Sequence, residues 1–246
     1  MSHFPLLVAL LFVLIFILST IFRLFSGPRP LNQAQAVVEY AQKKGYALVN
    51  PAISQALGSS PVEMLKNPAL RNSIRAAADI SDIEGLENGT GDWLAFTCSL
   101  RSHEVTIFNL SVTPRTVNSS SGNIHYKVAK ICAADLPRFS LGRNSGLHTL
   151  ENVVGKLVGT PKPTVDLDAR QYPEFAAHSW IRGSDAAAIT TFLSPSKIKF
   201  LGTAYLPGVL ATNAKYLVYF EDGALRTGAD FDSFVSRVET IVANVL

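Results

Sequence analysis

The sequence predicts an α+β protein in which an N-terminal transmembrane helix is followed by an antiparallel sheet packed with helices. Three observations support this fold class. Residues 4–22 are almost entirely apolar and carry no charged side chain. Several β-rich runs follow one another between residues 79 and 133, separated by Gly, Asn and Ser, which is typical of an antiparallel meander. Residues 230–245 keep apolar side chains at helical spacing.

The predicted anchor occupies residues 1–25 and is followed by a Gly/Pro linker at 26–30. The first Lys, Arg, Asp or Glu of the chain is Arg23. Roughly 20 apolar residues at about 1.5 Å rise each cross a bilayer core of about 30 Å. A cleavable signal peptide is the alternative, but such peptides have a basic start and a small-residue cleavage site. Neither is present here, so we expect an uncleaved anchor whose residues 4–25 contact the lipid bilayer.

Positive charge near the anchor predicts its orientation. Arg23 and Arg29 lie on the C-terminal flank, and the N-terminal flank carries only the α-amine and His3. Because Lys and Arg are retained on the cytoplasmic side, we expect a single-pass protein of the cell membrane with its soluble domain in the cytoplasm. A secreted or periplasmic protein with an uncleaved signal is the alternative.

Composition restricts the soluble part, which we expect to be one domain at residues 31–246 with a possible sub-boundary near 137–160. The chain has 22 basic and 19 acidic residues, so without Arg23 and Arg29 the ratio is 20 to 19. A nucleic-acid-binding protein usually shows a strong basic excess, so we expect no nucleic-acid partner.

The two cysteines, Cys98 and Cys132, each alternate with apolar residues along a predicted strand. We expect two free thiols that pack as small hydrophobic groups. A disulfide between them is the alternative if the domain lies outside the cell.

The N-terminal half of the soluble part begins with a predicted helix at 31–44 that stops at Gly45. A short strand at 46–49 follows. Asn or Ser precedes Pro51, Pro61 and Pro68, which is typical of helix N-termini and predicts three short helices. The predicted strands of this half lie at 79–86, 93–100, 104–116 and 124–133, with hairpin loops at 87–92 and 118–123.

The C-terminal half begins with a predicted amphipathic helix at 147–158, which the prolines at 161 and 163 interrupt. Ser184 is the expected cap of a helix at 185–193, and Ser194 with Pro195 starts the next one. Asp222 and Gly223 indicate a tight turn. The predicted strands of this half lie at 165–167, 175–182, 209–212 and 216–221, the turn leads into 224–226, and the last helix lies at 230–245.

The order of elements from Tyr172 onward resembles that of a broad group of uncharacterised bacterial proteins with one N-terminal transmembrane helix and an α+β domain. The resemblance depends on short segments: Leu-Pro-Arg-Phe-Ser-Leu at 136–141, Phe175 in a strand, Gly183-x-Asp185, Phe192-Leu193-x-Pro195, an apolar strand at 216–220 and the C-terminal helix. It covers about the last half of the chain. It implies the same architecture, and it implies no activity and no catalytic residues.

The motifs of catalysis and ligand binding point to no specific chemistry. The nearest approach to a nucleophile elbow, at 142–146, has the wrong spacing, and the phosphate-binding and zinc spacings do not occur. Asp166 and Asp168 would share a strand face, where we expect a solvated strand end. We expect His178 to be a satisfied strand residue and Asp185 to support the first turn of its helix. The sequence thus predicts no catalytic residue, no cofactor and no metal.

These observations favour a membrane-anchored binding or assembly module with an unknown protein or lipid partner, and they lean against an enzyme. The alternative is a membrane-tethered hydrolase whose site is assembled from dispersed residues. Its candidates are His148, His178, Asp166 and Asp168, and their meeting in one cleft would favour it.

Overall fold

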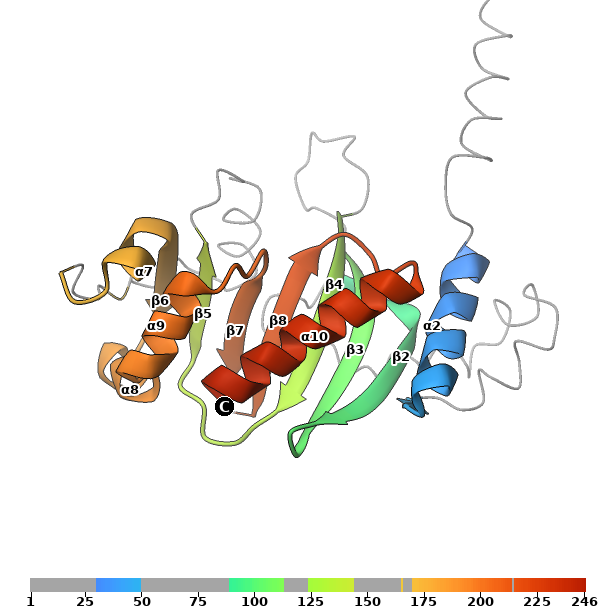
Figure 1. The fold of residues 1–246 in the computed structure, drawn as a ribbon, viewed down its shortest axis with the longest axis horizontal. Coiled ribbons are helices and arrows are strands. Elements are labelled where there is room, and N and C mark those ends of the chain that lie inside the picture. Colours follow the sequence, from blue (N-terminus) through green and yellow to red (C-terminus); the bar gives the residue numbers. More distant parts are fainter. Residues whose placement is uncertain (1–29, 50–88, 113–123, 144–164, 166–169, 214) are drawn as a thin grey trace, which may run out of the picture.

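The computed structural model of the chain describes residues 30–49, 89–112, 124–143, 165, 170–213 and 215–246, which form a layered α+β structure (Figure 1). Its centre is one eight-stranded antiparallel sheet with the order β1-β2-β3-β4-β8-β7-β5-β6. The strands are β1 (Ala47–Leu48), β2 (Gly89–Leu100), β3 (His103–Val112), β4 (Ile124–Cys132), β5 (Phe139–Arg143), β6 (Ser179–Gly183), β7 (Val209–Asn213) and β8 (Tyr216–Asp222). The predicted α+β class with an antiparallel sheet is confirmed.

The helices pack around this sheet. They are α2 (Pro30–Lys44), α7 (Pro173–His178), α8 (Ala186–Phe192), α9 (Pro195–Thr203) and α10 (Gly228–Val245). Within the described ranges, none of them is both long and apolar enough to cross a membrane. The predicted anchor at 1–25 and the linker residues 26–29 lie outside the described residues, whereas Pro30, which was predicted to end the linker, begins α2.

The strand order departs from a simple meander in the second half of the chain. The strands β2, β3 and β4 follow one another in space, as predicted, and the short β1 lies beside β2 at the edge. The chain then crosses to the far edge for β5 and β6, and β7 and β8 return to fill the gap beside β4. One sheet therefore contains strands from both sides of the possible sub-boundary near 137–160.

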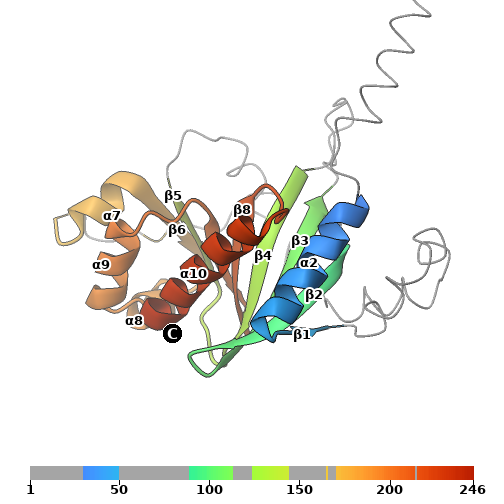
Figure 2. The same ribbon diagram turned by 45° about the vertical axis from the view of Figure 1, so that its right-hand side comes forward.

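One face of the sheet, called here the helix face, carries the larger core. The helix α10 crosses this face diagonally, and α2 lies beside it over β2 (Figures 1 and 2). Every described helix contributes buried side chains to this core. The seven predicted core positions of the last helix are all buried: Phe231, Phe234, Val235, Val238, Ile241, Val242 and Val245. Thr227 and Asp230 form a reciprocal capping box at its start.

The opposite face, called here the strand face, has a second apolar cluster. Among the described residues its buried members come from strands alone: Ala95, Phe108, Leu110, Tyr126, Val128, Trp180, Val209, Val218 and Phe220. The alternation of side chains along each strand separates the two clusters. For example, Ile107 belongs to the helix face and its neighbour Phe108 to the strand face.

The predicted strand at 175–182 is wrong in its first half. Residues 173–178 form α7, with Pro173 in the first turn, and the strand begins only at Ser179. Proline is well suited to a first helical position, and the two alanines that follow Phe175 favour helix. Phe175 and His178 are therefore helical residues, and the strand assigned to Phe175 in the family resemblance is corrected.

The strand β5 was not predicted from the sequence. It contains Gly142, which weakens a strand pattern. In the structure a Cβ at this position would lie 2.6 Å from the Trp180 ring on β6, so the close approach of that ring explains the glycine. Residues 224–226, which follow the predicted turn, lead from β8 into α10 without strand pairing.

Two further boundaries differ from the prediction. Residues 89–92 belong to β2 and not to a hairpin loop, and the β2–β3 hairpin turns at Arg101 and Ser102, both with positive φ. Asp185 caps α8 in place of Ser184, since its side chain accepts the Ala188 N–H at 2.9 Å. The predicted helices near Pro51, Pro61 and Pro68 and at 147–158, the strand at 79–86 and the loop at 118–123 lie outside the described residues.

Candidate functional site

A buried charge network joins the helix face to α10. Glu221 on β8 receives two hydrogen bonds from Arg237, with Nε to Oε1 at 2.5 Å and Nη2 to Oε2 at 2.9 Å. Lys127 Nζ lies 3.0 Å from Oε2, and the Tyr219 hydroxyl donates to Oε1 at 2.7 Å. Burial raises the pKa of this carboxyl, but the bonds from Arg237, Tyr219 and Lys127 outweigh burial and hold the pKa below its usual range. The group is fully partnered, so its role is to hold α10 on the sheet.

Two more buried polar side chains on this side of the molecule also hold the fold. Asn109 accepts the Leu225 N–H at 2.7 Å and donates to the Leu225 carbonyl at 3.3 Å. The Asn109 side chain thereby makes the two backbone hydrogen bonds that a neighbouring strand would otherwise make to the segment leading into α10. The Thr212 hydroxyl accepts the Phe139 N–H at 2.9 Å and also bonds to the Pro137 carbonyl, which aligns β5 with β7.

The helix α2 is fixed to α10 by a polar and aromatic contact. The Tyr40 hydroxyl donates to Asp232 at 2.9 Å, and Lys44 Nζ lies 2.9 Å from the same carboxylate. The Tyr40 ring stacks on Phe231 with centroids 4.8 Å apart. The hydrogen bonds of Lys44 and Tyr40 hold the pKa of Asp232 below its usual range. This contact sets the position of the element that follows the predicted anchor.

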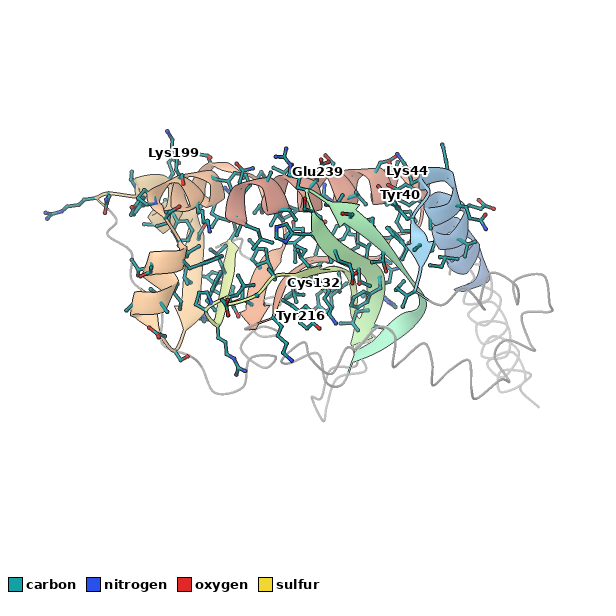
Figure 3. The ribbon with its side chains drawn as sticks, turned by 90° about the horizontal axis from the view of Figure 1, so that it is seen from below. Tyr40, Lys44, Cys132, Lys199, Tyr216 and Glu239 are labelled. Atoms are coloured by element: carbon teal, nitrogen blue, oxygen red, sulfur yellow. The ribbon has the colours of Figure 1, made fainter. Side chains whose placement is uncertain are left out.

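An accessible row of chemically diverse side chains crosses one end of the strand face. It runs over β2, β3, β4 and β8 because Ser99 pairs with Glu104, and Cys132 pairs with Tyr216. We call this row, with Lys130 one step inward on β4, the strand-face rim. Figure 3 shows Cys132 and Tyr216 on the side of the sheet opposite the helices. Ser99 and Glu104 are exposed and Cys132 and Tyr216 are half-buried, so the rim is open to a partner.

Lys130 is the unusual member of the rim. It is 8% exposed, and its Nζ lies 4.0 Å from the centroid of the Tyr216 ring. None of the ion pairs found among the described residues includes Lys130. Charged side chains that are this deeply buried are normally paired with an opposite charge. The rim therefore contains a mostly buried lysine whose Nζ lies over an aromatic ring.

Cys132 borders Lys130 and Glu104. Its Sγ lies 4.0 Å from Glu104 Oε1, and its carbonyl oxygen lies 3.1 Å from His103 Nδ1. Burial and the negative charge of Glu104 both raise the pKa of the Cys132 thiol. The thiol is thus a weaker nucleophile at neutral pH than an ordinary exposed cysteine.

The two cysteines are free, as the sequence analysis favoured. Cys98 belongs to the core of the helix face, whereas Cys132 lies on the strand face. Their strands lie on either side of β3, hence about 9–10 Å apart, and a disulfide needs Cα atoms within about 7 Å. The alternative of a Cys98–Cys132 disulfide is therefore incompatible with this sheet. Burial raises the pKa of Cys98 to about 11.

The candidates for a hydrolase site are not brought together in the described part of the chain. His178 is exposed at the C-terminal end of α7, so its predicted place in a strand is wrong. His148, Asp166 and Asp168 lie outside the described residues. Over the ranges that the structure describes, no group of three His, Cys, Asp or Glu side chains is arranged to hold a metal ion. Asp185 supports the first turn of α8, as predicted.

Sequence reasoning missed Lys130 although a signal was present. Residues 126, 128 and 132 alternate as apolar positions on β4, and Lys130 occupies the intervening position of the same face. A charged residue among the alternating apolar positions of a strand departs from the pattern of a buried face and therefore indicates a special role. The pairing with Tyr216 could not be read from the sequence, because β8 reaches β4 only after the excursion through β5, β6 and β7.

Comparisons with known proteins add no family. No protein-family model matches the chain, and neither the search of curated proteins nor the search of solved structures finds a match.

Proposed function

We propose that the protein is a membrane-anchored binding module that is held at the bilayer by residues 4–25 and binds a protein partner with the strand-face rim. The anchor is supported by the length of the apolar run before Arg23 and by the lack of charged side chains within it. The hydrolase alternative gains no support from the described residues, where His178 is its one candidate.

The observation that carries this proposal is the contrast between two charged side chains, Glu221 on the helix face and Lys130 on the strand face. On the helix face, Glu221, Arg237 and Lys127 satisfy one another. At the rim, the mostly buried Lys130 stands among side chains that are exposed or half-buried, and no carboxylate of the described residues pairs with it. A rim with this charge is suited to contact with a partner group of opposite charge.

The anchor is tested by membrane extraction of the full chain. We expect the protein to remain in the membrane pellet after washing at alkaline pH, and a variant that lacks residues 4–22 to be released. A reporter fused after Leu246 then reads the orientation, with a cytoplasmic signal expected from the flanking arginines. Release of the intact full chain by the wash would contradict the anchor.

The binding surface is tested by site-specific photo-crosslinking in membranes that contain the full chain. A photoreactive residue at Ser99 on the rim should give a discrete adduct with a second protein, and the same residue at Lys199 on α9 should not. Lys199 is exposed and lies on the opposite side of the sheet, so it is a matched control (Figure 3). The substitution Tyr216→Ala should reduce the Ser99 adduct. Equal adducts from both positions, or an adduct that Tyr216→Ala leaves unchanged, would contradict the proposal.

A further inference from the structure

We propose that Lys130, held over the Tyr216 ring, is the receptor for a carboxylate group presented by the protein partner. This inference deepens the proposed function and depends on it, because it assigns the chemistry of the group that the strand-face rim binds. Three steps support it: the lack of a counter-charge among the described residues, the N–H donors of the ammonium that an aromatic ring does not accept, and the charge of the neighbouring rim residues.

The first step compares two lysines of the same strand. Lys127 and Lys130 both lie on β4, three positions apart, so they point to opposite faces of the sheet. Lys127 is paired with Glu221 at 3.0 Å, whereas Lys130 has no ion pair within the part of the chain that the structure describes. Lys130 is nevertheless the more deeply buried of the two residues. The described part of the sheet thus provides a carboxylate for Lys127 and none for Lys130.

The second step concerns the position of the ammonium. An ammonium has three N–H donors, and an aromatic ring attracts it electrostatically without accepting a conventional hydrogen bond. Lys130 leans toward Tyr216 on β8, on the side of β4 away from the Glu104 strand. Cys132 and Tyr216, the neighbours of Lys130 on the rim, are half-buried. A carboxylate that arrives over these two side chains can accept the remaining N–H donors.

The third step limits the charge of the partner group. Glu104 is exposed and adjoins Cys132, with its Oε1 at 4.0 Å from the thiol sulfur. A carboxylate carries one negative charge, which the single ammonium of Lys130 neutralises, whereas a phosphate monoester carries about two at neutral pH and would keep a net negative charge beside Glu104. The rim therefore fits a single carboxylate, as on an Asp or Glu side chain, better than a phosphate group.

The position of Cys132 allows a direct test with small probes on the full chain in uncharged detergent. Iodoacetate and iodoacetamide are close in size and alkylate the same thiol, but only iodoacetate carries a carboxylate. The rate of carboxymethylation at Cys132 divided by that of carbamidomethylation measures how strongly the site favours the carboxylate. Peptide mass spectrometry separates Cys132 from Cys98, which is buried in the helix-face core.

We expect this ratio to fall by about threefold or more in Lys130→Met, since a unit charge about 7 Å away changes a local anion concentration by about that factor in water. The variant Lys130→Arg keeps the charge and should keep most of the ratio. The control Lys199→Met removes an exposed lysine on the helix side and should leave the ratio unchanged. Free acetate should slow the iodoacetate reaction of the native chain more than chloride does at equal ionic strength.

An unchanged ratio in Lys130→Met, or equal effects of acetate and chloride, would overturn the carboxylate receptor. The crosslinking experiment at Ser99 distinguishes this failure from failure of the proposed function. A rim adduct with an unchanged ratio would mean that the face binds a partner without this carboxylate contact. A lowered ratio with no rim adduct would leave an anion site and contradict the protein partner.

Discussion

The two faces of the sheet treat buried charge in opposite ways. On the helix face, the buried carboxylate of Glu221 is surrounded by donors from β4, β8 and α10. On the strand face, the ammonium of Lys130 lies over the Tyr216 ring at the edge of an apolar cluster. The first arrangement uses charge to position a helix, and the second is the charge that we propose a partner contacts.

The largest expected effect is the loss of the helix-face network. Glu221→Ala leaves Arg237 and Lys127 as half-buried cations without their shared, buried carboxylate. Breaking a buried ion pair by removing one partner costs about 3–5 kcal/mol. We expect the free energy of unfolding, measured by urea denaturation of the full chain in detergent, to fall by that amount.

The matched control for Glu221→Ala is Glu239→Ala on the exposed side of α10 (Figure 3). Surface substitutions of this kind usually change the free energy of unfolding by less than about 0.5 kcal/mol. If Glu221→Ala and Glu239→Ala cost the same, the distinction between the two faces would not hold.

A smaller loss is expected from Asn109→Ala on β3. This change leaves the N–H and carbonyl of Leu225 unpaired in a buried position. Each unsatisfied buried group costs about 1–3 kcal/mol. Urea denaturation should show a decrease in this range, and hydrogen exchange at Leu225 should become faster. Unchanged protection of the Leu225 amide would show that Asn109 does not hold this segment.

Acidification should weaken the helix face through the same carboxylate. The pKa of Glu221 is lower in the folded protein than in the unfolded chain, so its contribution to stability is present above the unfolded value. It is lost as the pH falls below about 4.5, where the unfolded chain takes up the proton first. Glu221→Gln should lose this part of the pH dependence in thermal unfolding measured between pH 7 and pH 3. An identical acid limb in the variant would assign the dependence to other carboxylates.

The sequence predicted the elements better than their pairing. The last helix, the hairpin strands and the starts of α9 and β7 follow from local patterns of apolar spacing, capping side chains and proline. The strand β5 was not predicted because it contains Gly142, and this glycine is explained only by the close approach of Trp180, a residue 38 positions later. Local pattern carries no information about such an approach. The order of the sheet was missed for the same reason, since it depends on long-range packing.

The candidate site shows the same limit. The exceptional charge of Lys130 within an apolar alternation is visible in the sequence, but its ring partner on β8 is not. The predicted carboxylate and histidine candidates were selected for their chemistry, and His178 proves to be an exposed helix end. Residue type alone identifies which groups could react or bind, whereas the fold decides which of them meet.

The smallest expected effect is also the sharpest comparison of the faces, because it sets Lys127→Met against Lys130→Met. Methionine keeps most of the length and apolar volume of lysine and removes the charge. At position 127 it deprives Glu221 of a donor, so we expect a loss of about 1–2 kcal/mol in the free energy of unfolding. At position 130 it removes an ammonium that has no carboxylate among the described residues. A thioether beside the Tyr216 ring is itself favourable by about 0.3–1.5 kcal/mol.

We therefore expect Lys130→Met to leave the free energy of unfolding unchanged or to raise it by less than about 1 kcal/mol. A loss at position 130 equal to that at position 127 would show that the fold already compensates both lysines, and the strand face would then have no charge left to offer a partner.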